Sequence, residues 1–176
     1  MNLAKITLMM LVIIICAGCN NSTFGTSNPD QEQQTATYLD MVDTELQQSD
    51  RLVSRAVGSL LTDVLPGTGR VLPDKSFVEK VKQATKQIDA VSQVLKARRY
   101  PSGLPRRIRE ELLTIRDNTL EAYRIKKKSL AILKKYLLHR DPYLMDEYRR
   151  LSQLSTKKQD EAHSRFASLK ARLALP

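Results

Sequence analysis

Residues 38–61, YLDMVDTELQQSDRLVSRAVGSLL, decide the fold class of this chain. Leucine or valine recurs there at intervals of seven residues, at Leu39, Leu46, Val53 and Leu60. A seven-residue interval keeps large apolar side chains on one face of a helix, and that face must be buried against other helices. The stretch therefore predicts a long amphipathic helix that belongs to a bundle.

Three further stretches show the same helical periodicity, and helix-breaking residues separate them. Pro66-Gly67-Thr68-Gly69 stops the first helix, and a Pro-Ser-Gly-Leu-Pro turn at 101–105 follows the second. Asp141-Pro142 is a typical N-cap followed by a first helical residue. We predict helices over about 37–65, 75–99, 105–140 and 142–174.

The predicted fold is all-α, because no stretch shows the alternation of a strand and the chain contains no tryptophan and few aromatic residues. Short connections favour antiparallel neighbours, which predicts an up-down bundle of four long helices over residues 37–176. One alternative stays open. Residues 140–142 could be a kink within one helix, giving an elongated three-helix body.

The N-terminal segment has the three parts of a cleaved secretory signal over residues 1–18. Lys5 supplies the positive start, Ile6 to Ile15 form an apolar run, and Ala17-Gly18 supply small residues before Cys19. The apolar run is shorter than the roughly 20 residues that a membrane-spanning helix needs.

Cys16-Ala17-Gly18-Cys19 resembles the lipobox of bacterial lipoproteins, although Cys16 stands where that family usually has leucine. The resemblance implies a diacylglycerol thioether on Cys19, cleavage before it, and acylation, for example with palmitate, of the new amine. Such chains anchor a protein to a membrane without a spanning helix. Asn20 in place of aspartate implies the outer membrane in a Gram-negative host. An ordinary cleaved signal that leaves Cys19 as a thiol is the alternative.

Residues 19–36 are expected to form the lipidated cysteine and a flexible linker. The stretch from Asn20 to Gln34 is rich in Asn, Ser, Thr, Gln and Gly, and Phe24 is its only large apolar residue. Such a composition buries too little apolar surface to offset the entropy of ordering the chain.

The chain carries a net charge of +10, and acids outnumber bases only in the segment before residue 65. Six cations surround the turn at 101–105, and a helical hairpin would crowd them at one tip. Because arginine binds phosphate in a bidentate fashion, this tip is a candidate polyanion-binding site. The six residues are Lys96, Arg98, Arg99, Arg106, Arg107 and Arg109.

A second basic run lies between residues 124 and 135, interleaved with apolar residues. We expect it to be a solvated helix face that the acidic first helix partly neutralises, with lysine stems covering apolar surface. The run consists of Arg124, Lys126, Lys127, Lys128, Lys134 and Lys135.

The sequence contains only weak matches to motifs of enzymes and metal sites. Leu65-Pro66-Gly67-Thr68-Gly69 matches a sortase signal, but more than a hundred residues follow it, so we interpret it as a helix stop. Asp160 and His163 share a helical face, yet the second half of a di-iron motif is missing. No nucleophile elbow marks a serine. We predict no catalytic, cofactor-binding or metal-binding residues, and no enzymatic activity.

These observations predict a lipid-anchored envelope lipoprotein facing the periplasm or the exterior, with a helical bundle that acts as adaptor, scaffold or accessory subunit of an envelope or secretion assembly. Its expected partners are the membrane, through the N-terminal lipid, and an envelope protein. The alternative is a lipoprotein whose basic tip binds phospholipid, lipopolysaccharide or cell-wall polymer. Export argues against nucleic acid as a partner.

Overall fold

The computed structural model describes residues 29–64 and 75–174, which form four α-helices and, within those ranges, no strand. The helices are α1 (Pro29–Val64), α2 (Lys75–Ala97), α3 (Arg106–His139) and α4 (Pro142–Ala174). The all-α prediction is confirmed. The expected signal at 1–18, Cys19, the linker up to residue 28 and the helix stop at 65–69 lie outside the described residues.

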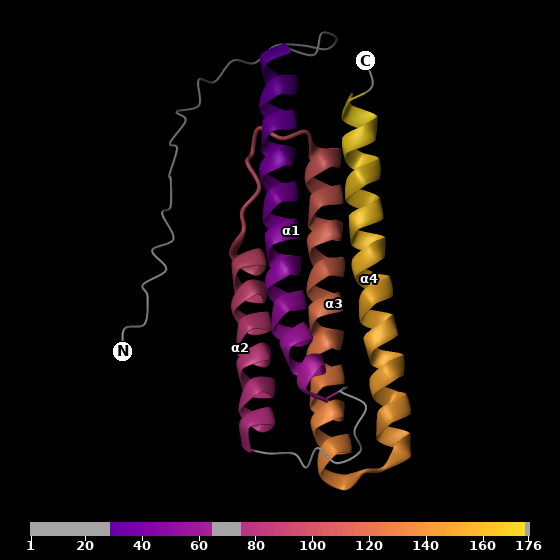
Figure 1. Ribbon diagram of the computed structural model, residues 1–176. Helices are drawn as coiled ribbons and strands as arrows, with labels where there is room; N and C mark the ends of the chain where they lie inside the picture. The colour runs from indigo at the N-terminus through magenta and orange to yellow at the C-terminus, as the bar shows by residue number, and fades with distance from the viewer. Residues whose placement is uncertain (1–28, 65–74, 175–176) are drawn as a thin grey trace, which may run out of the picture.

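The four helices form an up-down bundle in which each helix packs antiparallel to the next, and α4 closes the ring against α1 (Figure 1). Helices α1 and α3 therefore lie diagonally opposite each other, as do α2 and α4. The start of α1, the α2–α3 turn and the end of α4 share one end of the bundle, which we call the α1-start end. The α3–α4 turn lies at the opposite end, which we call the far end.

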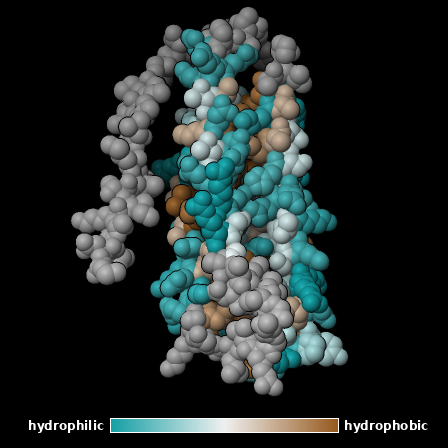
Figure 2. All heavy atoms as spheres, in the orientation of Figure 1, coloured by the Kyte–Doolittle hydropathy of each residue, from teal (hydrophilic) through white to brown (hydrophobic). Residues whose placement is uncertain are grey.

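The core contains the residues that the apolar periodicity predicts. Leu39, Leu46, Val53 and Leu60 are at most 6% exposed. The predicted stripe of α2 is also buried throughout, from Phe77 to Leu95. The surface is mostly hydrophilic in the view of Figure 2, and hydrophobic atoms show between the helices. Periodicity thus identifies which face of each helix turns inward.

Helices α3 and α4 make the most extensive contact in the bundle. Both helices bury small residues: Ala122 and Ser129 on α3, and Ser155 and Ala162 on α4, are all nearly inaccessible to solvent. The Ser155 hydroxyl donates a hydrogen bond of 2.8 Å to the Ala122 carbonyl. Small side chains let two helix backbones approach closely, and the serine hydroxyl gains a partner across the interface.

Residues 140–142 form a turn, so the alternative of one kinked helix is wrong. Arg140 adopts the left-handed conformation (φ 56°), and its N–H donates to the Tyr136 carbonyl at 2.6 Å, which ends α3. Asp141 then caps α4, because its Oδ1 accepts a hydrogen bond of 3.0 Å from the Tyr143 N–H. The predicted N-cap and first helical residue are confirmed.

Helix α1 begins at Pro29, eight residues before the predicted start, so the expectation of a linker is wrong for residues 29–36. Proline at the first helical position lacks only an N–H that would have no partner there. Asp30 and Glu32 in the first turn interact favourably with the helix dipole. Thr35, only 7% exposed, gives this first segment a buried contact.

Across the described ranges, none of the four helices combines the length and the apolar character needed to cross a bilayer.

Candidate anion-binding surface

The six cations of the predicted tip lie around the α2–α3 turn at the α1-start end, as the hairpin argument expects. Lys96 lies in the last turn of α2 and Arg106, Arg107 and Arg109 lie in the first turns of α3. The Leu104 side chain is buried beneath this turn, and its N–H donates to the Pro101 carbonyl at 3.3 Å. The turn is therefore held against the core.

Arg98 points into the bundle and is a structural residue. Its side chain is only 16% exposed and forms an ion pair with Glu45 of α1. Its guanidinium lies 5.9 Å from the centre of the Tyr38 ring, which meets Tyr100 edge to face. The Tyr100 hydroxyl in turn donates to the Leu112 carbonyl at 3.1 Å. Arg98 thus fastens α1 to the α2–α3 turn and is withdrawn from external ligands.

Two more tip arginines pair with acids on their own helix. The Arg106 Nε lies 2.7 Å from the Glu110 carboxylate, and the Arg107 Nε lies 3.7 Å from Glu111. Glu111 also pairs with Arg172 of α4. Of the six tip cations, Lys96, Arg99 and Arg109 have no ion pair within the described part of the chain. The tip is less basic than its sequence implies, because half of its cations are neutralised.

The second basic run is partly neutralised, but by helices other than the predicted one. The Arg124 Nε donates to Glu121 of α3 at 2.6 Å, and the Lys127 Nζ donates to Asp89 of α2 at 2.7 Å. The hydrogen bond from Arg124 lowers the pKa of the Glu121 carboxyl. The expectation that the first helix neutralises this run is wrong, because α1 lies diagonally across the bundle from α3.

Four lysines of this run have no acid partner among the described residues: Lys126, Lys128, Lys134 and Lys135. Lys128 and Lys135 are exposed and Lys134 is half-buried. Lys126 differs from the other three, since burial lowers the pKa of its ammonium group by disfavouring the charged form. The C-terminal half of α3 therefore carries a second group of cations without acid partners, besides the three at the tip.

The acids of α1 serve mainly to hold α4. The Lys170 Nζ lies 2.8 Å from the Asp40 carboxylate and 3.0 Å from that of Asp43. These hydrogen bonds raise the pKa of Lys170. The predicted attraction between an acidic first helix and a basic remainder is therefore realised between α1 and α4.

A polar network that sequence reasoning missed joins three helices. Asp50 of α1 accepts a hydrogen bond of 2.5 Å from the Tyr123 hydroxyl of α3 and pairs with His163 of α4. The Tyr123 ring is 1% exposed, whereas the His163 side chain is 43% exposed. Periodicity identified Tyr123 as core, but no local signal reveals that its hydroxyl meets an acid far away in the sequence.

The Asp50–His163 pair involves the histidine of the helical Asp160–His163 motif. His163 contacts Asp50 rather than Asp160, the residue three positions before it. No group of three or more His, Cys, Asp or Glu residues in the described ranges could hold a metal ion.

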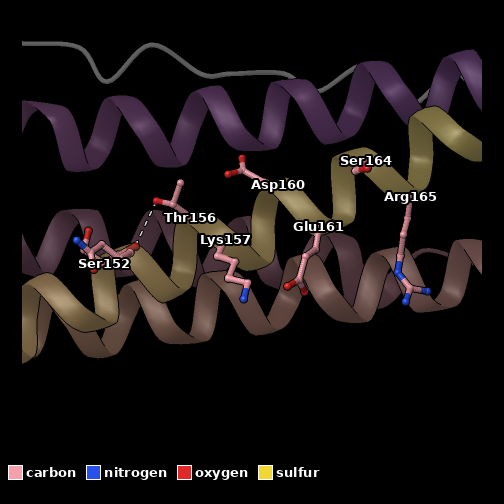
Figure 3. A pocket seen from close by; sticks show the side chains of 8 residues that line it. Ser152, Thr156, Lys157, Asp160, Glu161, Ser164 and Arg165 are labelled. Carbon is pink, nitrogen blue, oxygen red and sulfur yellow. Dashed lines mark hydrogen bonds between the residues drawn. The ribbon is translucent and has the colours of Figure 1, made fainter.

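One hollow on the described surface is a groove of about 740 Å³ along α4. Figure 3 shows Lys157, Glu161 and Arg165 in a row along one side of this helix, and Asp160 and Ser164 along the other. One helix supplies every lining residue, so no side chains from different elements converge there. The groove is therefore a surface feature of one helix.

Comparison with known proteins yields no relative: no protein-family model, no curated protein sequence and no solved structure matches this chain.

Proposed function

We propose that this chain is a lipid-anchored lipoprotein of the bacterial cell envelope, with a bundle that serves as a non-catalytic adaptor, scaffold or accessory subunit of an envelope or secretion assembly. The observation that carries the proposal is the apolar run ending in Cys16-Ala17-Gly18-Cys19. A diacylated and N-acylated cysteine would hold the protein on a membrane surface without a spanning helix.

The short connection between Cys19 and α1 would hold one end of the bundle near the membrane. Nine residues, 20–28, separate Cys19 from the first residue of α1. A chain of that length spans at most roughly 30 Å, so the α1-start end would stay close to the lipid headgroups. The far end would then point away from the membrane, where α3 and α4 offer exposed faces to a partner.

The anchor is tested by replacing each cysteine in turn. Cys19→Ser removes the acylated sulfur, and we expect the protein to leave the membrane fraction. Cys16→Leu installs the residue that is usual in the lipobox, and the protein should remain on the membrane. Membrane retention of Cys19→Ser would contradict the proposal.

The adaptor role is tested by crosslinking in intact cells, followed by solubilisation and purification. We expect one or a few envelope proteins to be recovered with the wild-type chain, and to be lost with Cys19→Ser. Recovery of the wild-type chain alone after mild crosslinking would contradict an adaptor role.

A further inference from the structure

We infer that the C-terminal half of α3 binds a carboxylate-bearing polymer of the cell wall, through Lys128, Lys134 and Lys135. This inference rests on the proposed envelope location. It adds a ligand that an adaptor role does not require, and it places the binding site away from the predicted tip.

The first support is that the acids around these lysines already have other partners. Within the described part of the chain, each acid on the surrounding surface of α2, α3 and α4 pairs with another cation, apart from the α4 cap Asp141 and Asp160 in the α4 groove. These pairs are Glu79–Lys82, Asp89–Lys127, Glu121–Arg124, Asp146–Arg149, Glu147–Arg150 and Glu161–Lys158. The three lysines therefore remain available to an external anion.

The spacing of the lysines suits an extended ligand. Lys128 and Lys135 are two helical turns apart, so they share one face of α3 and lie about 10 Å apart along its axis. Lys134 is adjacent to Lys135 and is half-buried. A single small anion cannot bridge that distance, whereas a polymer with repeated carboxylates can. Lysine ammonium groups are hydrated point charges without a fixed geometry, which suits a flexible polyanion.

The position of the face argues against the anchoring membrane as its ligand. Arg106 begins α3 at the α1-start end, so Lys128 and Lys135 lie about 33 and 44 Å further along the helix. Charges on the membrane are screened within about 8 Å at physiological salt. In a bundle that stands on its anchor, these lysines lie outside the field of the headgroups.

A bundle lying flat on the membrane is also disfavoured. Helices that lie in a membrane interface insert a broad apolar face between the headgroups. The apolar face of α3 is buried in the core, and few apolar residues lie between and beside its lysines: Ala131 and Leu138 are exposed, and Ile132 is partly exposed. At the same end, Tyr143 is 83% exposed and adds an aromatic ring that can pack on a sugar.

The test is co-sedimentation of the mature chain with purified peptidoglycan sacculi, compared with vesicles of phosphatidylglycerol and phosphatidylcholine. One variant changes Lys128, Lys134 and Lys135 to Glu. The matched variant makes the same change in net charge at the other end, with Lys96→Glu, Arg99→Glu and Arg109→Glu. Thermal unfolding followed by circular dichroism confirms that both variants fold.

We expect the wild-type chain to sediment with sacculi, and its affinity to fall steeply between roughly 50 and 300 mM salt. The α3 variant should bind about tenfold more weakly or worse, while the matched variant should lose less than about threefold. Equal losses in both variants, a larger loss in the matched variant, or binding to vesicles but not to sacculi would each overturn the inference.

This outcome is separable from the anchor test. If the natural chain carries no acyl group but binds sacculi, polymer binding by the α3 lysines is supported while the proposed anchor fails. If Cys19 is acylated but the wild-type chain does not bind sacculi, the inference about the α3 lysines fails while the proposed anchor stands.

Discussion

At the scale of single residues, the most consequential feature is a carboxylate shared by three helices. Asp50 is only 14% exposed at its side chain, and burial of a charge is costly unless it is paired. Tyr123 and His163 supply that pairing from α3 and α4. The network therefore fixes the relative position of α1, which otherwise contacts α4 least among its neighbours.

Replacing Tyr123 with Phe should destabilise the bundle by about 1.5–3 kcal/mol, because the ring stays buried while a hydrogen bond to a charged group is lost. Urea denaturation followed by circular dichroism measures the free energy of unfolding. Tyr143→Phe is the control: its hydroxyl lies on an exposed side chain, and the effect should stay within about 0.5 kcal/mol. Equal stabilities of the two variants would show that the Asp50 contact contributes nothing.

The tyrosines also predict how stability depends on alkaline pH. Burial raises the pKa of Tyr100 from 10.0 to about 12, and burial also raises the pKa of Tyr123. Between pH 10 and pH 12 the unfolded chain therefore releases phenolic protons that the folded chain retains. The titration of these tyrosines leaves the free energy of unfolding unchanged well below pH 10 and lowers it as pH rises through this window.

Urea midpoints measured from about pH 8 to pH 12 test this dependence. Tyr100→Phe should start from a lower stability, because the hydrogen bond to Leu112 is lost. Its stability should then fall less steeply above pH 10 than that of the wild type. An unchanged slope in the variant would contradict the role of Tyr100.

At the scale of the elements, apolar periodicity predicts helices well and their ends less well. The interval from Leu39 to Leu60 predicts the buried face of α1, because a helical repeat leaves few ways to bury so many large side chains. The start of α1 could not be predicted in that way. Among the side chains of residues 29–36 that the structure describes, only Thr35 is buried, and the helix there depends on Pro29 and on acids in the first turn.

The α3–α4 turn offers a direct test of one helix end. Asp141→Ala removes the oxygen that accepts the Tyr143 N–H, and should cost about 1 kcal/mol of stability. Asp141→Asn keeps an accepting oxygen at the same position, so it should restore most of that loss. Both are measured by thermal unfolding. Equal melting temperatures for the Ala and Asn variants would mean that the cap does not contribute.

At the scale of the whole molecule, the fold was predictable while the pattern of ion pairs was not. Periodicity shows which face of a helix turns inward, but it does not show which helices are neighbours. Placing α1 beside α4 gives Lys170 the acids that sequence reasoning had assigned to the run on α3. The same order brings Glu45 to Arg98 and so removes one cation from the predicted tip.

The cations at the two ends of the bundle differ in their ion pairs. The α1-start end carries the connection toward Cys19, and many of its cations are paired. The C-terminal half of α3 carries lysines without acid partners in the described ranges. A molecule held by lipid at one end would thus present these lysines at a distance from the membrane, while Lys96, Arg99 and Arg109 stay near the anchored end.

Mass spectrometry of the N-terminal tryptic peptide from membrane-extracted protein tests the central claim most directly. No lysine or arginine lies between Lys5 and Arg51, so a processed chain yields one peptide from Cys19 to Arg51. The account predicts that this peptide carries diacylglycerol on the Cys19 sulfur and an acyl chain on its amine. A peptide that begins at Ile6, or one with an unmodified Cys19 thiol, would contradict the account.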